Sequence, residues 1–343
     1  MDSPADPAEA ARLWQDLMGR IQGLEGSRNA DLLTGLLGSA LHLFEGRTDR
    51  RDLKMAHLAL AEACRALDVF NAYRHVPKVA VFGSARTKTD RPIYKMAADF
   101  SREIAAHGFM VLTGAGGGIM AAANEGAGRE NSFGLNIELP FEQDVNDTVA
   151  GDPKLIEFRF FFTRKLFFLK ETKALALFPG GFGTLDEGFE ALTLIQTGKS
   201  NPLPIVLMER EGSAYWEQWR EYLTDHLLAR GLIGKHDMHL FRICHTVQEG
   251  VDEITGFFRV FHSCVQTHDG VTIWLWRPLE PPEIERLNDE FTDMLGEGRI
   301  TQVYRAPRPV SDSGDEALSC IEVPMNHRHQ GRLRQLIDAI NAL

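Results

Sequence analysis

The chain has 343 residues, of which 44% are hydrophobic and 25% charged, and its formal net charge is −11. This composition is ordinary for a globular protein, and the length allows one large α/β domain with additions, or two domains. The negative charge argues against a nucleic-acid partner, because binding along a phosphate backbone needs a local excess of lysine and arginine. A small phosphate site built from backbone amides remains compatible with it.

The cysteine usage and the N-terminal segment indicate a cytoplasmic protein. Four scattered cysteines, with no CxxC pair, favour a reduced chain over a disulfide scaffold. Residues 1–17 are acidic and lack the basic end and apolar core of a signal peptide. No apolar run approaches the roughly 18 residues of a membrane span, so we expect no membrane partner.

Residues 1–75 are predicted to form a helical N-terminal region. Leu13, Leu17 and Ile21 recur at a spacing of four, and leucines between residues 32 and 43 form a broad apolar face. Residues 55–69 give a further candidate helix. We find no chemistry-bearing residues here, so the region is expected to pack against the rest of the chain or to form a dimer contact.

Residues 76–262 alternate between short apolar runs and helical patterns. This predicts an α/β domain of the Rossmann-like, doubly wound type, with a parallel sheet covered on both faces. The expected strands are 78–86, 109–114, 132–140, 173–180, 204–208 and 241–247, and a helix is expected at 158–172. Ligands bind beyond the carboxyl ends of such strands, so the glycines at 83, 114–118 and 180–183 should converge on one crevice.

Residues 263–343 are predicted to form a small α+β appendage. Strands are expected at 270–278 and 321–324, and helices near 281–295 and 328–342. Trp274 and Trp276 alternate as in a strand, which favours core or interface packing over ligand stacking. The stretch NHRHQ (326–330) has no further ligand at metal-site spacing, so we interpret it as a solvated helix start and expect no metal site.

The stretch GAGGGIM (114–120) follows a strand and opens a helix. Its amides could therefore face an anion at the positive end of the helix. The alternative is a tight turn that is merely rich in glycine. Ile119 breaks the G-x-G-x-x-G dinucleotide pattern, and the GK[ST] of a P-loop is missing.

The stretch FPGGFGTLDEGFE (178–190) combines four glycines with three carboxylates. Gly180, Gly181 and Gly183 would open the backbone to a ligand. Thr184 and Glu187 have the spacing of a capping box, which would give Glu187 a structural role. In the alternative interpretation, Glu187 acts on a ligand held by the glycines.

A cationic pair, Arg164 and Lys165, interrupts the aromatic segment FFTRKLFFLK. Both side chains could extend from an apolar helix to solvent. Alternatively, the planar guanidinium of Arg164 could reach the crevice and hold a phosphate, a ribose hydroxyl or a carboxylate.

These motifs together resemble the LOG family of cytokinin riboside 5′-monophosphate phosphoribohydrolases, whose members are often labelled lysine decarboxylases. The resemblance rests on PGGFGTLDE (179–187), the Arg164–Lys165 pair upstream of it and the turn at 114–120. FGSAR after the first strand and GLNIELPFEQ after the third fit the larger bacterial members. The resemblance covers roughly residues 76–260.

The resemblance implies hydrolysis of the N-glycosidic bond of a nucleoside 5′-monophosphate, either AMP or a cytokinin riboside 5′-monophosphate, to free base and ribose 5-phosphate. It places the family's catalytic arginine and glutamate on Arg164 and Glu187. The candidate substrate- and phosphate-binding residues are Gly83, Ser84, Gly116, Gly117, Gly118, Met120, Lys165, Gly180, Gly181, Gly183 and Thr184. No metal or other cofactor is implied, and a homodimer or higher homo-oligomer is expected.

Other functions remain open. Molybdenum-cofactor carrier proteins share a similar glycine-rich core and would bind a ligand without turnover, as would a nucleotide sensor or assembly protein. The intact Arg164 and Glu187 favour an enzyme. We reject lysine decarboxylase activity, because the sequence shows no identifiable pyridoxal-phosphate lysine. Short plant-type members carry Gly-Leu-Met-Gly where this chain has residues 118–121, GIMA, so the preferred base is open.

Overall fold

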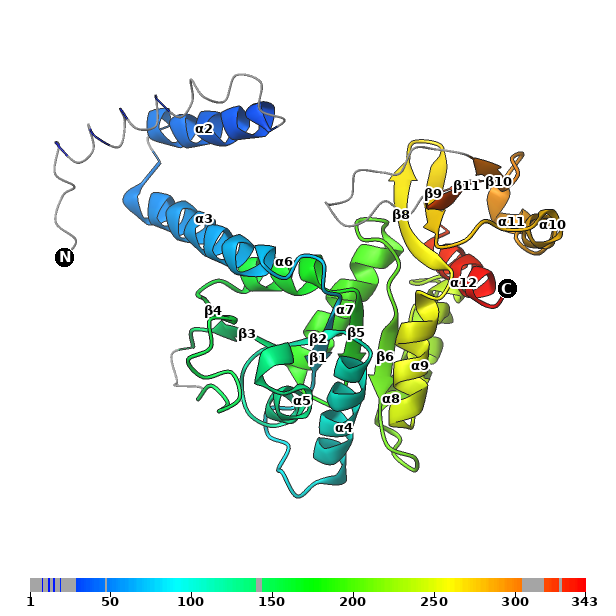
Figure 1. The fold of residues 1–343 in the computed structure, drawn as a ribbon, viewed down its shortest axis with the longest axis horizontal. Helices are drawn as coiled ribbons and strands as arrows, with labels where there is room; N and C mark the ends of the chain where they lie inside the picture. Colours follow the sequence, from blue (N-terminus) through cyan, green and yellow to red (C-terminus); the bar gives the residue numbers. More distant parts are fainter. Residues whose placement is uncertain are drawn as a thin grey trace. The chain divides into compact units, whose positions relative to one another are not determined.

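The computed structural model describes residues 8, 12, 15, 19, 29–46, 48–139, 144–303, 318–326 and 329–343. It divides into two compact units, residues 1–61 and 62–343, which are described separately (Figure 1). The predicted repeat of Leu13, Leu17 and Ile21 lies outside the described residues. The proposed division into residues 1–75, 76–262 and 263–343 stays a prediction.

The first unit contains helix α2 (Ala30–Glu45) and the first part of α3 (Arg50–Asn71), which confirms the predicted N-terminal helices. The carboxylate of Asp49 accepts hydrogen bonds from the amides of Arg51 and Asp52 and so caps the start of α3. Leu32 and Leu36 on α2 are 65% and 56% exposed. Within this unit, α2 therefore presents apolar side chains at its surface.

The second unit is built on a parallel sheet, as predicted, which has seven strands where six were expected. Its order is β4-β3-β2-β1-β5-β6-β7. The strands are β1 (Lys78–Phe82), β2 (Met110–Thr113), β3 (Ser132–Ile137), β4 (Leu155–Phe158), β5 (Ala174–Leu177), β6 (Ile205–Met208) and β7 (Arg242–Cys244). The chain winds outward in one direction from β1 and in the other from β5, so the topological switch point lies between these two strands.

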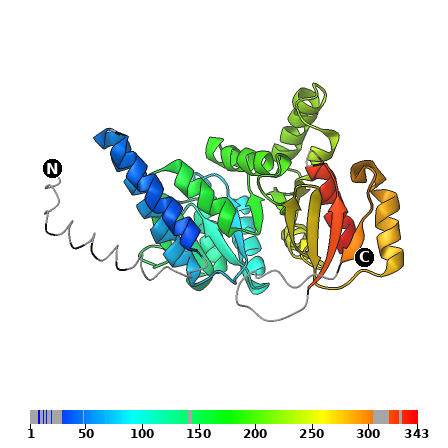
Figure 2. The same cartoon turned by 90° about the horizontal axis from the view of Figure 1, so that it is seen from above.

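Helices cover both faces of this sheet (Figure 2). Alternate residues of β1 enter two separate hydrophobic clusters: Val79 and Val81 join one, and Ala80 and Phe82 join the other. The first cluster includes side chains from α4 (Pro92–Ala106), α5 (Ile119–Ala127) and α9 (Val247–Phe257), and the second includes side chains from α3, α6 (Phe161–Glu171), α7 (Phe182–Gln196) and α8 (Tyr215–Tyr222). The fold is therefore doubly wound, as the sequence predicts.

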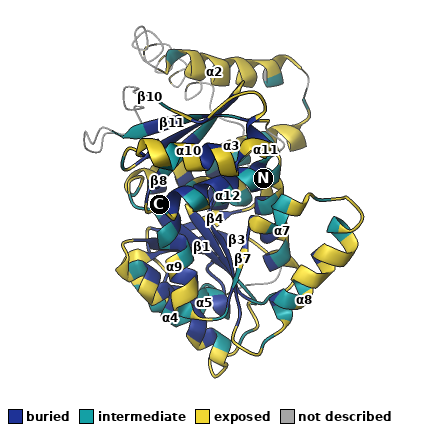
Figure 3. Cartoon of the chain, turned by 90° about the vertical axis from the view of Figure 1, so that its right-hand side faces the viewer, coloured by how far each residue is buried: buried dark blue, intermediate teal, exposed yellow. Residues whose placement is uncertain are grey.

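The C-terminal part is a four-stranded antiparallel sheet with helices, which confirms the predicted α+β appendage. Its elements are β8 (Phe261–Thr267), β9 (Gly270–Leu275), α10 (Pro281–Glu290), α11 (Thr292–Leu295), β10 (Thr301–Val303), β11 (Ser319–Pro324) and α12 (Gln330–Asn341). The side chain of Asn341 fastens α12 to the turn before β8: it accepts from the amides of Val260 and Phe261 and donates to the Phe257 carbonyl. Short turns of 3₁₀ or π helix complete the unit: η1 (Arg129–Asn131), η2 (Leu223–Leu228) and η3 (Lys235–His239). Dark blue ribbon in Figure 3 marks the buried parts of both sheets.

Some predicted boundaries are wrong. The edge strand β4 was not predicted, and the helix expected from residue 158 begins at Phe161 because Phe158 ends β4. Strands β8 and β10 were also missed; β10 has only three residues, too few to show an alternation. At the predicted start of the last helix, His327 and Arg328 lie outside the described residues, whereas Gln330 is buried and not solvated.

Trp274 in β9 and Trp276 just after it differ in burial. Trp274 is 8% exposed, as predicted for a core residue, whereas Trp276 is 50% exposed and lies edge-on to the ring of His262. In the part of the chain that is described, no helix combines the length and the apolar character needed to cross a membrane.

A buried carboxylate joins the middle of α3 to the start of α6. Glu62 is 1% exposed, its Oε1 accepts from the Arg159 amide at 2.8 Å, and its Oε2 accepts from the Thr163 hydroxyl at 2.6 Å. A helix start presents unpaired amides and a positive partial charge, so a carboxylate there is favourable. Glu62 thereby fixes the first turn of the helix that carries Arg164.

We expect Glu62→Ala to lower the free energy of unfolding by about 2–4 kcal/mol, because two donors lose a charged acceptor. Glu62→Gln keeps an acceptor and should cost less. Asp68→Ala, on the exposed side of the same helix, serves as the control and should stay within about 0.5 kcal/mol of the wild type. Urea denaturation measures all three; equal effects of Glu62→Ala and Asp68→Ala would contradict the role of Glu62 in fixing the start of α6.

Candidate active site

A cavity of about 730 Å³ lies beyond the carboxyl ends of β1 and β5, at the switch point. It brings together residues from the turn after β1, from α5 and α6, and from the turn between β5 and α7. Nine of the candidate site residues line it: Gly83, Ser84, Met120, Arg164, Gly180, Gly181, Gly183, Thr184 and Glu187. The predicted convergence of the turns after β1 and β5 on one crevice is therefore seen in the fold.

Hydrogen bonds between main-chain groups hold these turns together. The Ser84 amide donates to the Pro179 carbonyl at 3.1 Å, and the Ser84 carbonyl accepts from the Ile119 amide at 3.1 Å. The Tyr215 hydroxyl, from α8, donates to the Gly180 carbonyl at 2.6 Å. The turns after β1 and β5 and the start of α5 thus form one connected wall of the cavity.

The glycines of this wall have two different roles. A Cβ at Gly83 would lie 2.6 Å from the Ile119 side chain, and one at Gly180 would lie 3.0 Å from the Ser84 amide, so these glycines allow the turns to pack closely. At Gly181 and Gly183 no atom outside the adjoining backbone lies within 4 Å of the Cβ position. These two glycines leave the backbone accessible to a ligand.

Helix α7 begins at Phe182 with Gly181 as its N-cap, and no side chain caps it. The capping box between Thr184 and Glu187 is therefore wrong: Thr184 lies within the first turn, and its amide donates to the Gly181 carbonyl. The extended backbone of Gly181 allows the helix to start earlier than the box requires. The first amides of α7 are left to face an anion.

Glu187 is a buried carboxyl in this cavity, 7% exposed. Burial raises its pKa to about 7, although the cations of Lys165 and Arg164 oppose the shift; Glu190 and Asp186 add to it. A carboxyl with a pKa near neutrality can exchange protons with a substrate or with water at physiological pH.

Arg164 reaches the cavity from α6. Its Nε donates to the Leu135 carbonyl at 2.8 Å, and its guanidinium lies 5.3 Å from the centre of the Phe168 ring. Burial lowers its pKa, which the charge of Glu187 partly offsets. A Cβ at Gly114 would collide with the Arg164 guanidinium, so this glycine makes room for the arginine.

Lys165 faces α7 and does not line the cavity. Its ammonium donates to Glu190 at 2.6 Å, lies 2.9 Å from an oxygen of Asp186, and is 3.8 Å from an oxygen of Glu187. Against the effect of burial, the hydrogen bonds to Glu190 and Asp186 raise the pKa of Lys165. Lys165 therefore influences the cavity through its charge near Glu187.

The glycines at 116–118 do not line this cavity either, and their phosphate-binding role stays a prediction. Gly117 and Gly118 border a separate hollow of about 620 Å³ together with Asn146. The Asn146 amide donates to the carbonyls of Ala115 and Gly116. Gly118 has a φ of 62° and lies against the Ser84 carbonyl, so it serves the tight start of α5.

Sequence reasoning missed the apolar side of the cavity. Leu139, Phe161 and Phe182 line it and are 38%, 53% and 94% exposed. Phe182 lies inside the glycine motif. An aromatic residue at this helix start was the sequence signal that could have indicated the apolar side of the cavity. Exposed aromatic side chains at the rim of a cavity can stack on a planar base.

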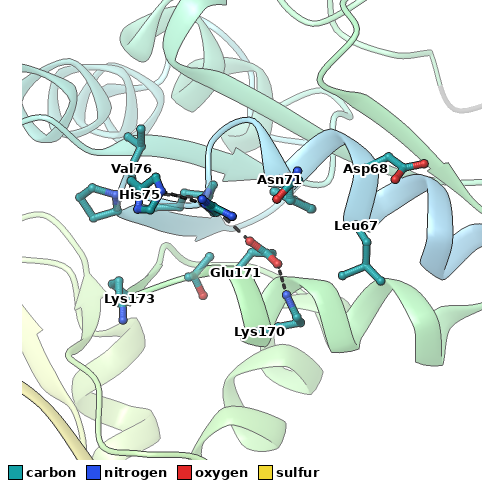
Figure 4. A pocket seen from close by; sticks show the side chains of 13 residues that line it. Leu67, Asp68, Asn71, His75, Val76, Lys170, Glu171 and Lys173 are labelled. Carbon is teal, nitrogen blue, oxygen red and sulfur yellow. Dashed lines mark hydrogen bonds and ion pairs between the residues drawn. The ribbon is translucent and has the colours of Figure 1, made fainter. Parts of the chain in front are cut away.

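A second cavity, of about 560 Å³, lies at the opposite, amino ends of β1 and β5 (Figure 4). Its buried Lys78 donates to the carbonyls of Tyr73 and Val76 at 2.8 and 3.1 Å and lies 3.8 Å from Glu171. Burial lowers the pKa of Lys78. Its hydrogen bonds are made within the fold, and none of the predicted site residues lines this cavity.

Comparison with solved structures finds weak likenesses. The protein TM1055 has 21% identity and a TM-score of 0.39, over 52% of this chain and 98% of its own. A molybdenum-cofactor-binding protein from Rippkaea orientalis has 19% identity and a TM-score of 0.38, over 53% of this chain and 96% of its own. The molybdenum cofactor carrier protein from Chlamydomonas reinhardtii has 22% identity and a TM-score of 0.37, over 53% of this chain and 97% of its own. At these values the matches carry no inference about a ligand.

No curated protein sequence matches the chain. A protein-family model described as "Possible lysine decarboxylase" matches residues 117–254. The matched range includes α6, with Arg164, and the turn from β5 into α7, with Glu187. The chain therefore contains, over residues 117–254, a domain of the LOG family.

Proposed function

We propose that the protein hydrolyses the N-glycosidic bond of a nucleoside 5′-monophosphate and releases the free base and ribose 5-phosphate. The observation that carries the proposal is the pairing, in one cavity, of a buried carboxyl of raised pKa with an uncapped helix start. Glu187 supplies the carboxyl, and Gly181 and Gly183 open the helix start to a ligand. Membership in the LOG family agrees with this reaction class.

The phosphate is assigned to the start of α7. The free amides there and the helix dipole favour an anion. Glu187 lies six residues after Gly181, which is about 9 Å along the axis at 1.5 Å per residue, and its side chain tilts back toward the helix start. A ribose fits between the phosphate and the carboxylate, and it keeps the two negative charges apart.

In the reaction, water adds to C1′ of the ribose as the bond from C1′ to the base nitrogen breaks. Ionised Glu187 orients the water, takes its proton and stabilises the positive charge that develops on the ribose. That proton is finally carried by the released base. Arg164 positions the substrate beside Glu187, and the seated phosphate supplies binding energy remote from the reacting bond.

A non-catalytic carrier would gain nothing from a carboxylate of this kind. Placing Glu187 close to a bound phosphate opposes binding electrostatically, whereas an enzyme uses the carboxylate in the transition state. The arrangement therefore favours turnover over simple binding.

We expect Glu187→Gln to lower kcat by about 10²–10⁴, the range for losing one general acid–base group, while the Kd for the nucleotide changes little. Glu190→Gln is the matched control, because Glu190 shares Lys165 with Glu187 but does not line the cavity. Chromatographic assay of base release and calorimetric binding of AMP measure the two effects. Base release undiminished in Glu187→Gln would exclude this role for Glu187, and nucleotide binding without release in the wild type would favour a carrier.

The reaction should require Glu187 in its ionised form. With a pKa of about 7, kcat/KM should rise about tenfold per pH unit below pH 7 and level off above it. Lys165→Gln should move this limb to higher pH, because the charge of Lys165 lowers the pKa of Glu187. The substrate phosphate also titrates, near pH 6. Because Lys165 does not line the cavity, Lys165→Gln should leave the pKa of that phosphate unchanged. A limb that stays at the same pH in Lys165→Gln would assign the titration to another group.

A further inference from the structure

Three potential metal ligands meet beyond the carboxyl ends of β6 and β7. Glu209 directly follows β6, His245 directly follows β7, and Glu217 lies in the first turn of α8. The two strands pair in parallel, and the Glu209 amide donates to the Cys244 carbonyl at 3.0 Å, which sets Glu209 beside His245. One ligand atom from each of the three residues lies within 4.8 Å of the others.

Only one of the two oxygens of the Glu209 carboxylate accepts hydrogen bonds from the described residues. The residue has no exposed surface, and its Oε2 accepts from the Trp216 amide at 2.9 Å and from the Ser213 hydroxyl at 3.1 Å. Its Oε1 has no hydrogen-bond partner among the described residues, and neither has Nδ1 of His245. Buried polar atoms are nearly always paired, so two such atoms facing each other indicate a missing ligand.

The distances suit a cation between these atoms. Glu209 Oε1 lies 4.0 Å from His245 Nδ1, which is too long for a hydrogen bond. The ligand atom of Glu217 lies within 4.8 Å of those of the other two residues. Zinc bonds to nitrogen and carboxylate oxygen measure about 2.0–2.2 Å, so two ligands at a tetrahedral angle lie about 3.4 Å apart. Glu209 Oε1 and His245 Nδ1 would therefore approach each other by about 0.6 Å to share one ion, and the Glu217 oxygen would move by up to about 1.4 Å.

We propose that Glu209, Glu217 and His245 bind a divalent first-row transition-metal ion of the zinc type. One imidazole and two carboxylates are suitable ligands for such an ion. The side chains of Glu217 and His245 are 30% and 36% exposed, so water can reach the ion and complete its coordination. Ser213 and Trp216 hold the Glu209 carboxylate in place from the other side.

The ion has a structural role and lies outside the reaction. None of its three ligands lines the cavity that contains Glu187 and Arg164. It would tie the start of α8 to the ends of β6 and β7, and the same turn of α8 carries Tyr215, which bonds to Gly180. The proposal stands independently of the function proposed above.

The test is titration of the chelator-treated full-length chain with zinc chloride by isothermal calorimetry. We expect one ion per chain, bound about tenfold or more weakly in Glu209→Gln and in His245→Ala. Glu217→Gln is a further variant at a partly exposed side chain outside the core, and it should also weaken binding. His268→Ala removes a fully exposed histidine beside Asp269 and should leave binding unchanged.

A thermal scan provides the second readout. Zinc should raise the Tm of the wild type and of His268→Ala, because a ligand that binds only the folded state stabilises it, and it should raise the Tm less in the three site variants. The proposal is overturned if the wild type binds no stoichiometric zinc. It is equally overturned if binding survives in Glu217→Gln and His245→Ala, or disappears in His268→Ala.

Discussion

The hydrogen bond from the Ser84 amide to the Pro179 carbonyl joins the turns after β1 and β5, where the winding of the sheet reverses. Adjacent helices leave this point in opposite directions, so their connections separate and a crevice opens there. Gly83 and Gly180 are the positions where the turns approach too closely for a side chain. The location of the cavity thus follows from the topology and from two glycines, before any catalytic group is considered.

The charged groups of the cavity depend on this arrangement. Glu187 is buried within one turn of helix from Asp186 and Glu190, and Lys165 lies against all three carboxylates. Burial dominates, so the pKa of Glu187 is held near neutrality, whereas Lys165 and Arg164 limit the shift. Arg164 is fixed by the Leu135 carbonyl, and its helix is fixed at its start by Glu62. Residues from outside the glycine motifs therefore position the proposed catalytic pair.

The sequence predicts the parallel sheet, both added regions and the meeting of the glycine turns after β1 and β5, because apolar strands and glycine turns carry local signals. The resemblance to the LOG family, and not a local signal, placed Arg164 and Glu187 beside these glycines. Prediction from the sequence fails where the role of a residue depends on contacts with parts of the chain that are distant in sequence. Glu62 lies about one hundred residues from the helix start that it fixes, and β4 is a short edge strand with only partial burial. The role of Gly114 was also hidden, because it depends on the position of a side chain from another helix.

The most direct measurement is the product balance of the wild-type protein with AMP, isopentenyladenosine monophosphate, GMP and CMP. The proposed reaction predicts free base and ribose 5-phosphate in equal amounts from at least one of these, and their relative rates would give the preferred base. Nucleotides that remain intact at enzyme concentrations sufficient to bind them would contradict hydrolysis, and the cavity would then be a binding site alone.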